Sequence, residues 1–321
     1  MLVAYDNLLI MINEKLIQAI NWETIVIVCN NDLDIASNLW DKFEHVLRFP
    51  ISSDFSLWAV NFDISISKLF EIYTKIEEDF KSLPKEAKIL VYKDENWPFQ
   101  IDSFSFPARV LYCLGNTDLL KKKSVAIVGT KSPKKETVVK VEKVVKALIR
   151  NEVLVTSGLS LGIQGHAAVH SLSNFSPVIS VLATDLKSFY PEGHKKIQEY
   201  IAREGGLVLT RVAPNNNNIK WNVLLRNRLM SSLSSALMII EERDRGGAVR
   251  MADYSLENKR DVFFFSALKR DKSITWPKLL IEKGAKVIRF PSDLPKAVNG
   301  DKSEQGDKKL SKEEIVQLKL F

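Results

Sequence analysis

Between Ser124 and Phe290 the chain alternates between short apolar runs and longer segments whose apolar residues recur at helical spacing. The apolar runs, in order, are SVAIVG, EVLVTSG, PVISVLAT, GLVLTRV, ALMIIEE, DVFFFSA and KVIRF. Because these runs are continuous rather than alternating with polar residues, they predict strands that are covered on both faces. Strands that alternate with helices along the chain predict an α/β fold with a doubly wound, mostly parallel sheet.

The preceding residues have a different pattern, which is mostly helical from about residue 5 to 83. Within it, the run ETIVIVC fits either a strand or a buried helical turn. SLPKEAK is typical of a linker, and KILVYKD after it predicts a further strand. We therefore expect a small, mainly helical N-terminal domain over residues 1–85 and the α/β domain over residues 86–293. Residues 294–321 are largely polar, and we expect a flexible tail that ends in QLKLF.

The composition is that of an ordinary folded protein, with 45% hydrophobic and 26% charged residues in a chain of 321. The formal net charge of +7 favours a polyanionic partner, although a mild basic excess is also common in proteins that bind none. No apolar run approaches the length of a membrane span, and the first residues lack the basic region of a signal peptide. Cys29 and Cys113 are the only cysteines, which favours the reducing cytoplasm over a disulfide framework or a zinc site.

The residues that follow the predicted strands form the candidate site, because ligands of an open parallel sheet bind at the carboxyl ends of its strands. Glycines follow several of these strands, and they let the backbone approach a phosphate at a helix N-terminus. Lys131, Lys187, Arg226 and Arg228 would supply positive charge around the same crevice. The pattern predicts a phosphate-binding rim, although tight turns and solvated charges would explain the same residues.

Arg226 and Arg228 bracket Asn227 shortly before a buried apolar run, and no acidic residue stands beside them. Two permanent charges next to a core element need either acids from elsewhere in the fold or an external anion. Glu241 and Glu242 follow the next strand, and we expect at least one of them to be a counter-charge to the arginines rather than a catalytic group.

Other chemistry is poorly supported. Neither GxGxxG nor GxxxxGK[ST] is present, so a conventional dinucleotide enzyme or P-loop nucleotidase is not expected. His166 and His170 have a metal-competent spacing but lack a third ligand, and we expect a structural or surface role for them. Ser157 stands in TSGLS rather than GxSxG, without a visible acid–histidine partnership. We expect no catalytic residue, no metal and no cofactor.

Several motifs in a fixed order resemble the DNA-processing protein family DprA, also called Smf. They are SVAIVGTK, VLVTSGLSLGI, VISVLATDLKSFYP, GLVLTRV, LLRNRLMSSLS, LMIIEE and RDVFFFSA, preceded by WPFQIDSFSFPARVLYCLGNTDLL. The resemblance runs from about Asp94 to Ala267. It implies an extended Rossmann-like domain in a cytoplasmic bacterial protein without catalytic activity. It also implies a homodimer that binds and protects single-stranded DNA and loads the recombinase RecA onto it during natural transformation and recombination.

The resemblance also implies which residues contact DNA. The family's GSR motif, whose arginine lines the DNA pocket, appears here with a lysine, which keeps the charge but loses the bidentate fork. The family's RNR triplet is unchanged. The implied DNA-binding residues are Gly129, Thr130, Lys131, Ser157, Gly158, Gly162, Lys187, Arg226, Asn227, Arg228, Gly246 and Gly247. Phe189 or Tyr190 near the rim could stack on a base, with core packing favoured for at least one of them.

Departures from the family pattern indicate a divergent member. SGLARGID reads SGLSLGIQ here, which loses an arginine and an aspartate. The family's histidine four residues after that aspartate is Ala168, and its aspartate three residues before Tyr-Pro is Lys187. The phenylalanine–proline pair before the RNR triplet is Val223-Leu224, and the SGSLxTA segment reads GGAVRMA.

The end of the chain resembles the QLxLF peptide with which bacterial replication and repair proteins bind the sliding clamp. The contact residues would be Gln317, Leu318, Leu320 and Phe321. A short extended peptide on a flexible tether suits such binding. A chance apolar end that folds back onto the domain would explain the same residues.

Two further functions remain open. One is a sensor or hydrolase of a nucleotide derivative, since the Gly246-Gly247 turn after an acidic strand is faintly similar to that of lysine-decarboxylase-like nucleoside phosphate hydrolases. Val249 and Arg250 stand where those proteins carry a threonine and a catalytic glutamate, which makes catalysis a weak prediction. The other is a scaffold that bridges RecA or the clamp through its surface.

Overall fold

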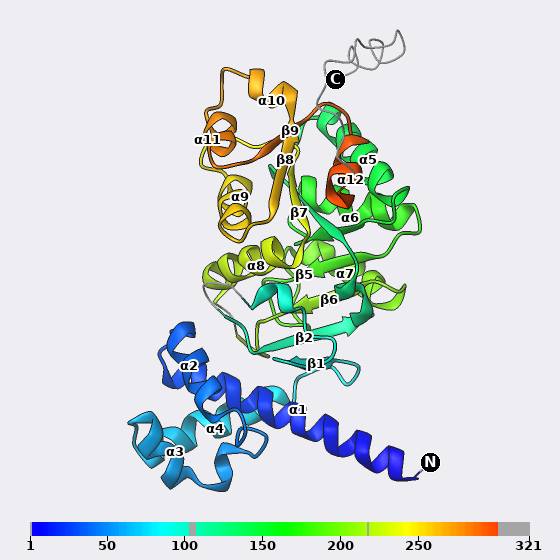
Figure 1. Ribbon diagram of the computed structural model, residues 1–321. Coiled ribbons are helices and arrows are strands. Elements are labelled where there is room, and N and C mark those ends of the chain that lie inside the picture. The colour runs from blue at the N-terminus through cyan, green and yellow to red at the C-terminus, as the bar shows by residue number, and fades with distance from the viewer. Residues whose placement is uncertain (1, 103–106, 217, 301–321) are drawn as a thin grey trace.

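The computed structural model describes residues 2–102, 107–216 and 218–300, with a helical segment at one end of a large sheet (Figure 1). The strands are β1 (Lys88–Val91), β2 (Val110–Gly115), β3 (Ser124–Val128), β4 (Leu154–Ser157), β5 (Val178–Val181), β6 (Leu207–Thr210), β7 (Ala236–Ile239), β8 (Asp261–Phe265) and β9 (Lys286–Ile288). The α-helices are α1 (Leu2–Val28), α2 (Leu33–Phe43), α3 (Phe55–Phe62), α4 (Ile66–Phe80), α5 (Lys135–Ile149), α6 (Ile163–Ser173), α7 (Lys195–Arg203), α8 (Ile219–Leu233), α9 (Gly247–Glu257), α10 (Ser266–Arg270), α11 (Trp276–Glu282) and α12 (Asp293–Asn299). None of these helices, as far as the chain is described, is both long and apolar enough to cross a membrane.

The strands form one sheet in the order β1-β2-β6-β5-β4-β3-β7-β8-β9. Neighbouring strands from β6 to β9 in this order are parallel, whereas β2 is antiparallel to both β1 and β6. The expected doubly wound, mostly parallel sheet is confirmed, and the antiparallel pair β1–β2 extends it. The chain builds β4, β5 and β6 on one side of β3 and then places β7, β8 and β9 on the other. The strand order therefore reverses between β3 and β7, where such sheets bind their ligands.

Helices cover both faces of the sheet, which explains why its strands are continuously apolar. Successive side chains of a strand point to opposite faces. In β3, Val125 and Ile127 pack with α5, α6 and α12, whereas Ala126 and Val128 pack with α8, α9 and α11. All four side chains are fully buried. Figure 1 shows the two groups of helices on opposite sides of the strands.

The run ETIVIVC, which fitted a strand or a helical turn, completes the long helix α1 except for its last residue. The hydroxyl of Thr24 donates to the carbonyl of Ile20 at 2.8 Å, so this polar side chain is satisfied within the helix. The buried amide of Asn21 donates to the carbonyls of Leu47 and Phe49, both at 2.8 Å. These bonds join α1 to the segment after α2 and favour the helix over a strand.

The helical segment α1–α4 and the sheet share one hydrophobic core. Tyr112 of β2 is fully buried, and its ring contacts Phe80 of α4 with 5.8 Å between centroids. The Tyr112 hydroxyl donates to Oε1 of Glu23 in α1 at 2.9 Å. Arg109, just before β2, donates to both carboxylate oxygens of Asp41 in α2 at 3.0 and 2.7 Å. The helices are thus held on the sheet by packing and by charge-assisted hydrogen bonds.

Residues 294–299, which were assigned to the start of the flexible tail, belong to α12 instead. Leu294 in this helix is fully buried in the core that α5 also joins. The polar residues around Leu294 in the sequence concealed the apolar packing of this short helix. Residues 301–321 lie outside the part of the chain that the structure describes.

The buried carboxyl of Glu23 predicts a pH-dependent stability. Burial raises its pKa from the ordinary value of 4.5 to about 7, against the lowering effects of the Tyr112 hydrogen bond and of Arg211. The folded protein then binds more protons than the unfolded chain between these two values, so stability falls as the pH rises through them. We expect Glu23→Gln to flatten this fall in the midpoint of urea unfolding. Glu71→Gln, which removes an exposed carboxylate of α4, should keep the wild-type slope, and equal slopes in all three proteins would contradict the prediction.

Candidate nucleic-acid interface

Three loops meet where the strand order reverses, and the backbone of Thr130 joins them. Its N–H donates to the carbonyl of Glu241, after β7, at 2.8 Å. Its own carbonyl accepts from the N–H of Ile163, at the start of α6, at 3.2 Å. The loops after β3, β4 and β7 therefore form one surface at the carboxyl edge of the sheet.

Two glycines permit this close approach. At Gly129, with φ 155°, a Cβ would lie 2.4 Å from the carbonyl oxygen of Glu241. At Gly162, with φ 75°, a Cβ would lie 2.4 Å from the carbonyl oxygen of Thr130. Both distances are far below van der Waals contact, and both φ values favour glycine. The packing of loop on loop thus requires these glycines whether or not a phosphate binds there.

Ser157 is fully buried and organises the loop between β4 and α6. Its hydroxyl donates to the carbonyl of Gln164 at 3.0 Å and accepts from the N–H of Leu159 at 3.1 Å. The N–H of Gly158 donates to Oε1 of Gln164 at 2.9 Å. Ser157 therefore shapes the loop from below its surface, and the structure places it out of reach of a ligand on that surface.

Arg226 of α8 is a buried cation for which the described residues provide no ion-pair partner. Its side chain donates through Nη1 to the carbonyl of Gly158, and only 6% of the residue is exposed. Its Nε has no hydrogen-bond partner among the described atoms. Burial lowers the pKa of the guanidinium to about 10, offset in part by the nearby Tyr190. Arg226 is thus still charged at neutral pH, and an unbalanced buried charge of this kind is costly.

Glu241 and Glu242, at least one of which was expected to be a counter-charge to the two arginines, form no ion pair with Arg226 in the described part of the chain and accept hydrogen bonds from other groups. The Glu241 carboxylate accepts from the hydroxyl of Thr137 in α5. The Glu242 carboxylate accepts from the N–H of Arg243 at 3.0 Å and of Ala248 at 3.2 Å. Both acids are therefore used to fix the loop after β7 and the start of α9.

The arginine–asparagine–arginine triplet does not act as a single patch. Residues two apart on a helix lie about 200° apart around its axis. Arg226 accordingly reaches the loop after β4, whereas the Arg228 guanidinium stacks 4.3 Å above the ring of Tyr254 in α9. Asn227 lies between them, half-buried.

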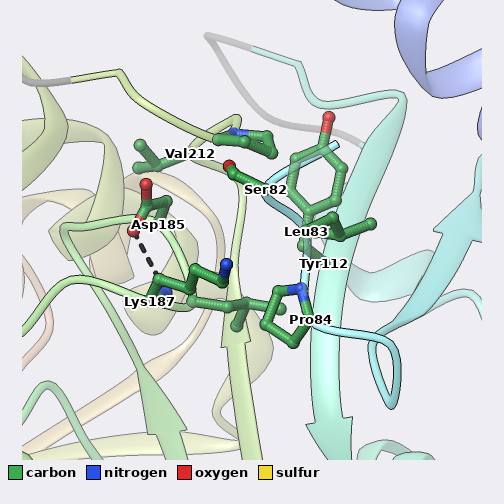
Figure 2. A pocket seen from close by; sticks show the side chains of 9 residues that line it. Ser82, Leu83, Pro84, Tyr112, Asp185, Lys187 and Val212 are labelled. Atoms are coloured by element: carbon green, nitrogen blue, oxygen red, sulfur yellow. Dashed lines mark hydrogen bonds between the residues drawn. The ribbon is translucent and has the colours of Figure 1, made fainter. Parts of the chain in front are cut away.

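The two lysines of the predicted rim, Lys131 and Lys187, are exposed. Lys187 stands in a turn that is closed by Asp185, whose Oδ1 accepts from the N–H of Lys187 at 3.1 Å and of Ser188 at 2.8 Å (Figure 2). Tyr190 follows on the same segment and is 53% exposed. This segment therefore offers an exposed positive charge and an exposed ring at the carboxyl edge.

Gly246 and Gly247 begin α9, but an acid already occupies this helix terminus. A Cβ at Gly246 would lie 2.2 Å from Cδ of Glu242, so the glycine makes room for that carboxylate. The carboxylate takes the position at the helix N-terminus that favours a phosphate elsewhere. Gly246 is thus explained by its contact with Glu242, whereas Gly247 is exposed with open space around it.

Three residues at this edge were not among the predicted site residues. His194 bonds through Nδ1 to the carbonyl of Leu159 at 2.6 Å and so joins the segment after β5 to the loop after β4. No sequence signal marks this contact, which spans 35 positions. Arg243 and Arg245 are exposed beside Asp244. Their position directly after a predicted strand is a signal that could have included them.

The remaining predicted features are the two histidines of α6 and the C-terminal peptide. His166 and His170 stack on α6 with 6.4 Å between ring centroids. Over residues 2–102, 107–216 and 218–300, no group of three or more His, Cys, Asp and Glu side chains is arranged to hold a metal ion. The predicted clamp-binding residues Gln317, Leu318, Leu320 and Phe321 lie outside the described residues.

The reversal of strand order beside basic loops places the chain among Rossmann-like α/β proteins that bind ligands at the carboxyl edge of the sheet. Within that class, the chain belongs to the family of DNA recombination-mediator protein A, whose model matches residues 88–299. The family resemblance of the sequence motifs is thereby confirmed.

Relatives and solved structures agree with this membership. The chain is 30% identical to the DNA processing protein DprA of Streptococcus pneumoniae over 219 residues, which is 68% of this chain and 76% of that protein. The structure of that streptococcal protein matches with a TM-score of 0.70 and 26% identity, over 88% of this chain and 96% of the other. DNA processing protein A of Helicobacter pylori, whose structure is described for its single-stranded DNA binding mode, matches with a TM-score of 0.59 and 28% identity over 67% of this chain and 97% of the other.

The contact between Gly158 and Arg226 can be tested with a matched pair of glycine variants. Gly158→Ala would place a Cβ 1.7 Å from Nη1 of Arg226, so the guanidinium must leave its buried position. We expect a loss of about 1–3 kcal/mol in the free energy of unfolding, measured in urea. Gly247→Ala is the control, since nothing lies within 4 Å of a Cβ there. It should be neutral or stabilising by up to about 1 kcal/mol, and equal stability of the two variants would refute the packing role of Gly158.

Proposed function

We propose that the carboxyl edge of this sheet binds single-stranded DNA, and that the protein is a DNA-binding protein rather than an enzyme. The observation that carries the proposal is Arg226, a buried charge for which the described residues supply no carboxylate. Exposed Lys131 and Lys187 lie at the same edge. A phosphate backbone would supply the missing negative charge. Family membership and the single-stranded DNA binding mode described for the Helicobacter relative support the same ligand.

Such binding would be largely indifferent to base sequence, because it acts through phosphates. Tyr190 offers an exposed ring on which a base can stack. Phe189 is half-buried beneath Lys195, whose ammonium lies 5.3 Å from the ring centroid, and its role is packing. The remaining predicted contacts at Gly129, Thr130 and Gly162 would be made by the backbone of the joined loops.

The family to which the chain belongs supports a wider role. We propose that the protein protects single-stranded DNA in the cytoplasm, acts as a homodimer, and loads the recombinase RecA during natural transformation and recombination. A nucleotide-derivative hydrolase is a weaker candidate, because the carboxylates of Glu241 and Glu242 are held by Thr137 and by helix amides. A scaffold that binds RecA or the clamp but no DNA is the other alternative.

Binding of labelled oligo-dT, measured by fluorescence anisotropy over a salt series, tests the proposal. We expect salt-sensitive binding of the single strand and weaker binding of duplex DNA. If each lysine contacts one phosphate, Lys131→Ala/Lys187→Ala should reduce the slope of log K against log salt by about 1.4.

The matched control is Lys121→Ala/Lys122→Ala, which removes the same charge from exposed lysines just before β3, at the opposite edge of the sheet. This variant should keep the wild-type slope. An equal decrease of the slope in both double variants would show that net charge, rather than the carboxyl edge, determines binding. Absence of binding by the wild type would favour the nucleotide and scaffold alternatives.

The tail has its own test. We propose that Gln317, Leu318, Leu320 and Phe321 bind the DNA polymerase sliding clamp as a short peptide. Deletion of residues 317–321 should abolish binding to immobilised clamp in surface plasmon resonance and leave oligo-dT affinity unchanged. Clamp binding that survives the deletion would eliminate the tail as the contact.

A further inference from the structure

We propose that the helical segment α1–α4 positions the DNA-binding turn of Lys187 through a hydrogen-bonded chain of Asp79, Asn215 and Asp185. This inference rests on the proposed single-stranded DNA binding. Asp79 belongs to α4, Asn215 to the loop between β6 and α8, and Asp185 to the segment after β5. Three elements far apart in sequence therefore meet at one turn.

Asp185 is the centre of this chain. It is buried, with 7% of its surface exposed, and its carboxylate accepts from three backbone N–H groups. Oδ1 binds the amides of Lys187 and Ser188, and Oδ2 binds the amide of Asn215 at 2.9 Å. Hydrogen bonds from backbone amides to a carboxylate are strong. The turn that carries Lys187 is therefore fastened to the loop that carries Asn215.

Asn215 in turn is fastened to the helical segment. Its side-chain amide donates to Oδ1 of Asp79 at 2.9 Å. Oδ2 of the same carboxylate pairs with Lys75 one turn earlier on α4, at 3.1 Å. Asn215 has a φ of 61°, in the left-handed region that asparagine tolerates better than most residues. The side chain of Asn215 thus bonds to the helical segment, and its backbone N–H bonds to the turn of Lys187 through Asp185.

Packing accompanies these bonds. Ser82, Leu83 and Pro84, directly after α4, face the segment of Asp185 and Lys187 across a cavity of about 10 Å³, which is room for about one water molecule (Figure 2). Leu186 between the two charged residues is 4% exposed and belongs to the core shared by the helices and the sheet. A displacement of the end of α4 would therefore be felt at the turn.

The consequence for binding is specific to Lys187. A lysine gains from a phosphate contact only what remains after its side chain and backbone are ordered. A turn that is already held by Asp185 reduces that cost, and the helical segment contributes by holding Asn215. If the hydrogen-bonded chain served only the stability of the fold, its loss would lower the melting temperature. The contribution of Lys187 to binding would then stay unchanged.

A double-mutant cycle separates these possibilities. Asn215→Gly removes the amide side chain while glycine keeps the positive φ and the backbone N–H. We expect Lys187→Ala to weaken oligo-dT binding in the wild-type background and to have little further effect in the Asn215→Gly background. The expected departure from additivity is roughly threefold, within the range for residues in one network. The melting temperature of each variant is recorded alongside.

Two control variants act at Asp79 itself. Asp79→Asn keeps an oxygen that can accept from Asn215 and should bind oligo-dT as the wild type does, whereas Asp79→Ala should resemble Asn215→Gly. Lys75→Ala removes only the other partner of Asp79, at a lysine side chain that is 75% exposed, and should bind normally.

Hydrogen exchange gives a readout without DNA. The amides of Lys187 and Ser188 should exchange faster in Asn215→Gly and Asp79→Ala than in Asp79→Asn. Additive effects on oligo-dT binding, or exchange that is equal in all variants, would overturn the positioning role while single-strand binding stands. Absence of oligo-dT binding by the wild type would overturn the proposed function itself, whatever the exchange shows.

Discussion

The carboxyl edge of this sheet depends on the two backbone hydrogen bonds of Thr130. Through these bonds the backbone of Thr130 joins the loops after β3, β4 and β7. Both bonds are made by peptide groups, so they do not depend on the side chain at this position. The glycines at 129 and 162 follow from this constraint, because a Cβ at either position would collide with a carbonyl oxygen. On the same edge, the carbonyl of Gly158 accepts a hydrogen bond from Arg226. A short piece of backbone thus fixes how the three loops of the edge meet.

The buried strands and their order along the chain could be predicted because strands that are buried on both faces have uninterrupted apolar sequences. Other features depend on contacts that the sequence does not display. The run ETIVIVC is helical because α1 packs on the sheet, and residues 294–299 belong to a helix rather than to the tail because Leu294 packs beside α5. Strand β2 joins the sheet in antiparallel pairing, which apolar patterning alone does not specify.

For the candidate site, the sequence indicated which residue types follow the strands but not the contacts that surround them. The absence of a nearby acid correctly marked Arg226 as an unusual charge, but its burial depends on Gly158, which lies 68 residues earlier. The divergence of Arg226 and Arg228 follows from helix geometry and could have been predicted from the triplet alone. The use of Glu242 at the start of α9 could not, because it depends on the conformation of the loop after β7.

The turn of Lys187 has a consequence for how this protein can change over evolutionary time. Asp185 accepts from the main-chain N–H groups of Lys187 and Ser188, so these hydrogen bonds do not depend on the side chains at those two positions. A substitution at position 187 or 188 can then alter charge without altering the backbone. Lys187 is exposed in this turn, and its charge is carried by a side chain on which the turn's hydrogen bonds do not depend. Affinity for an anionic ligand is accordingly a property that mutation can adjust in small steps at this turn, while the scaffold stays intact.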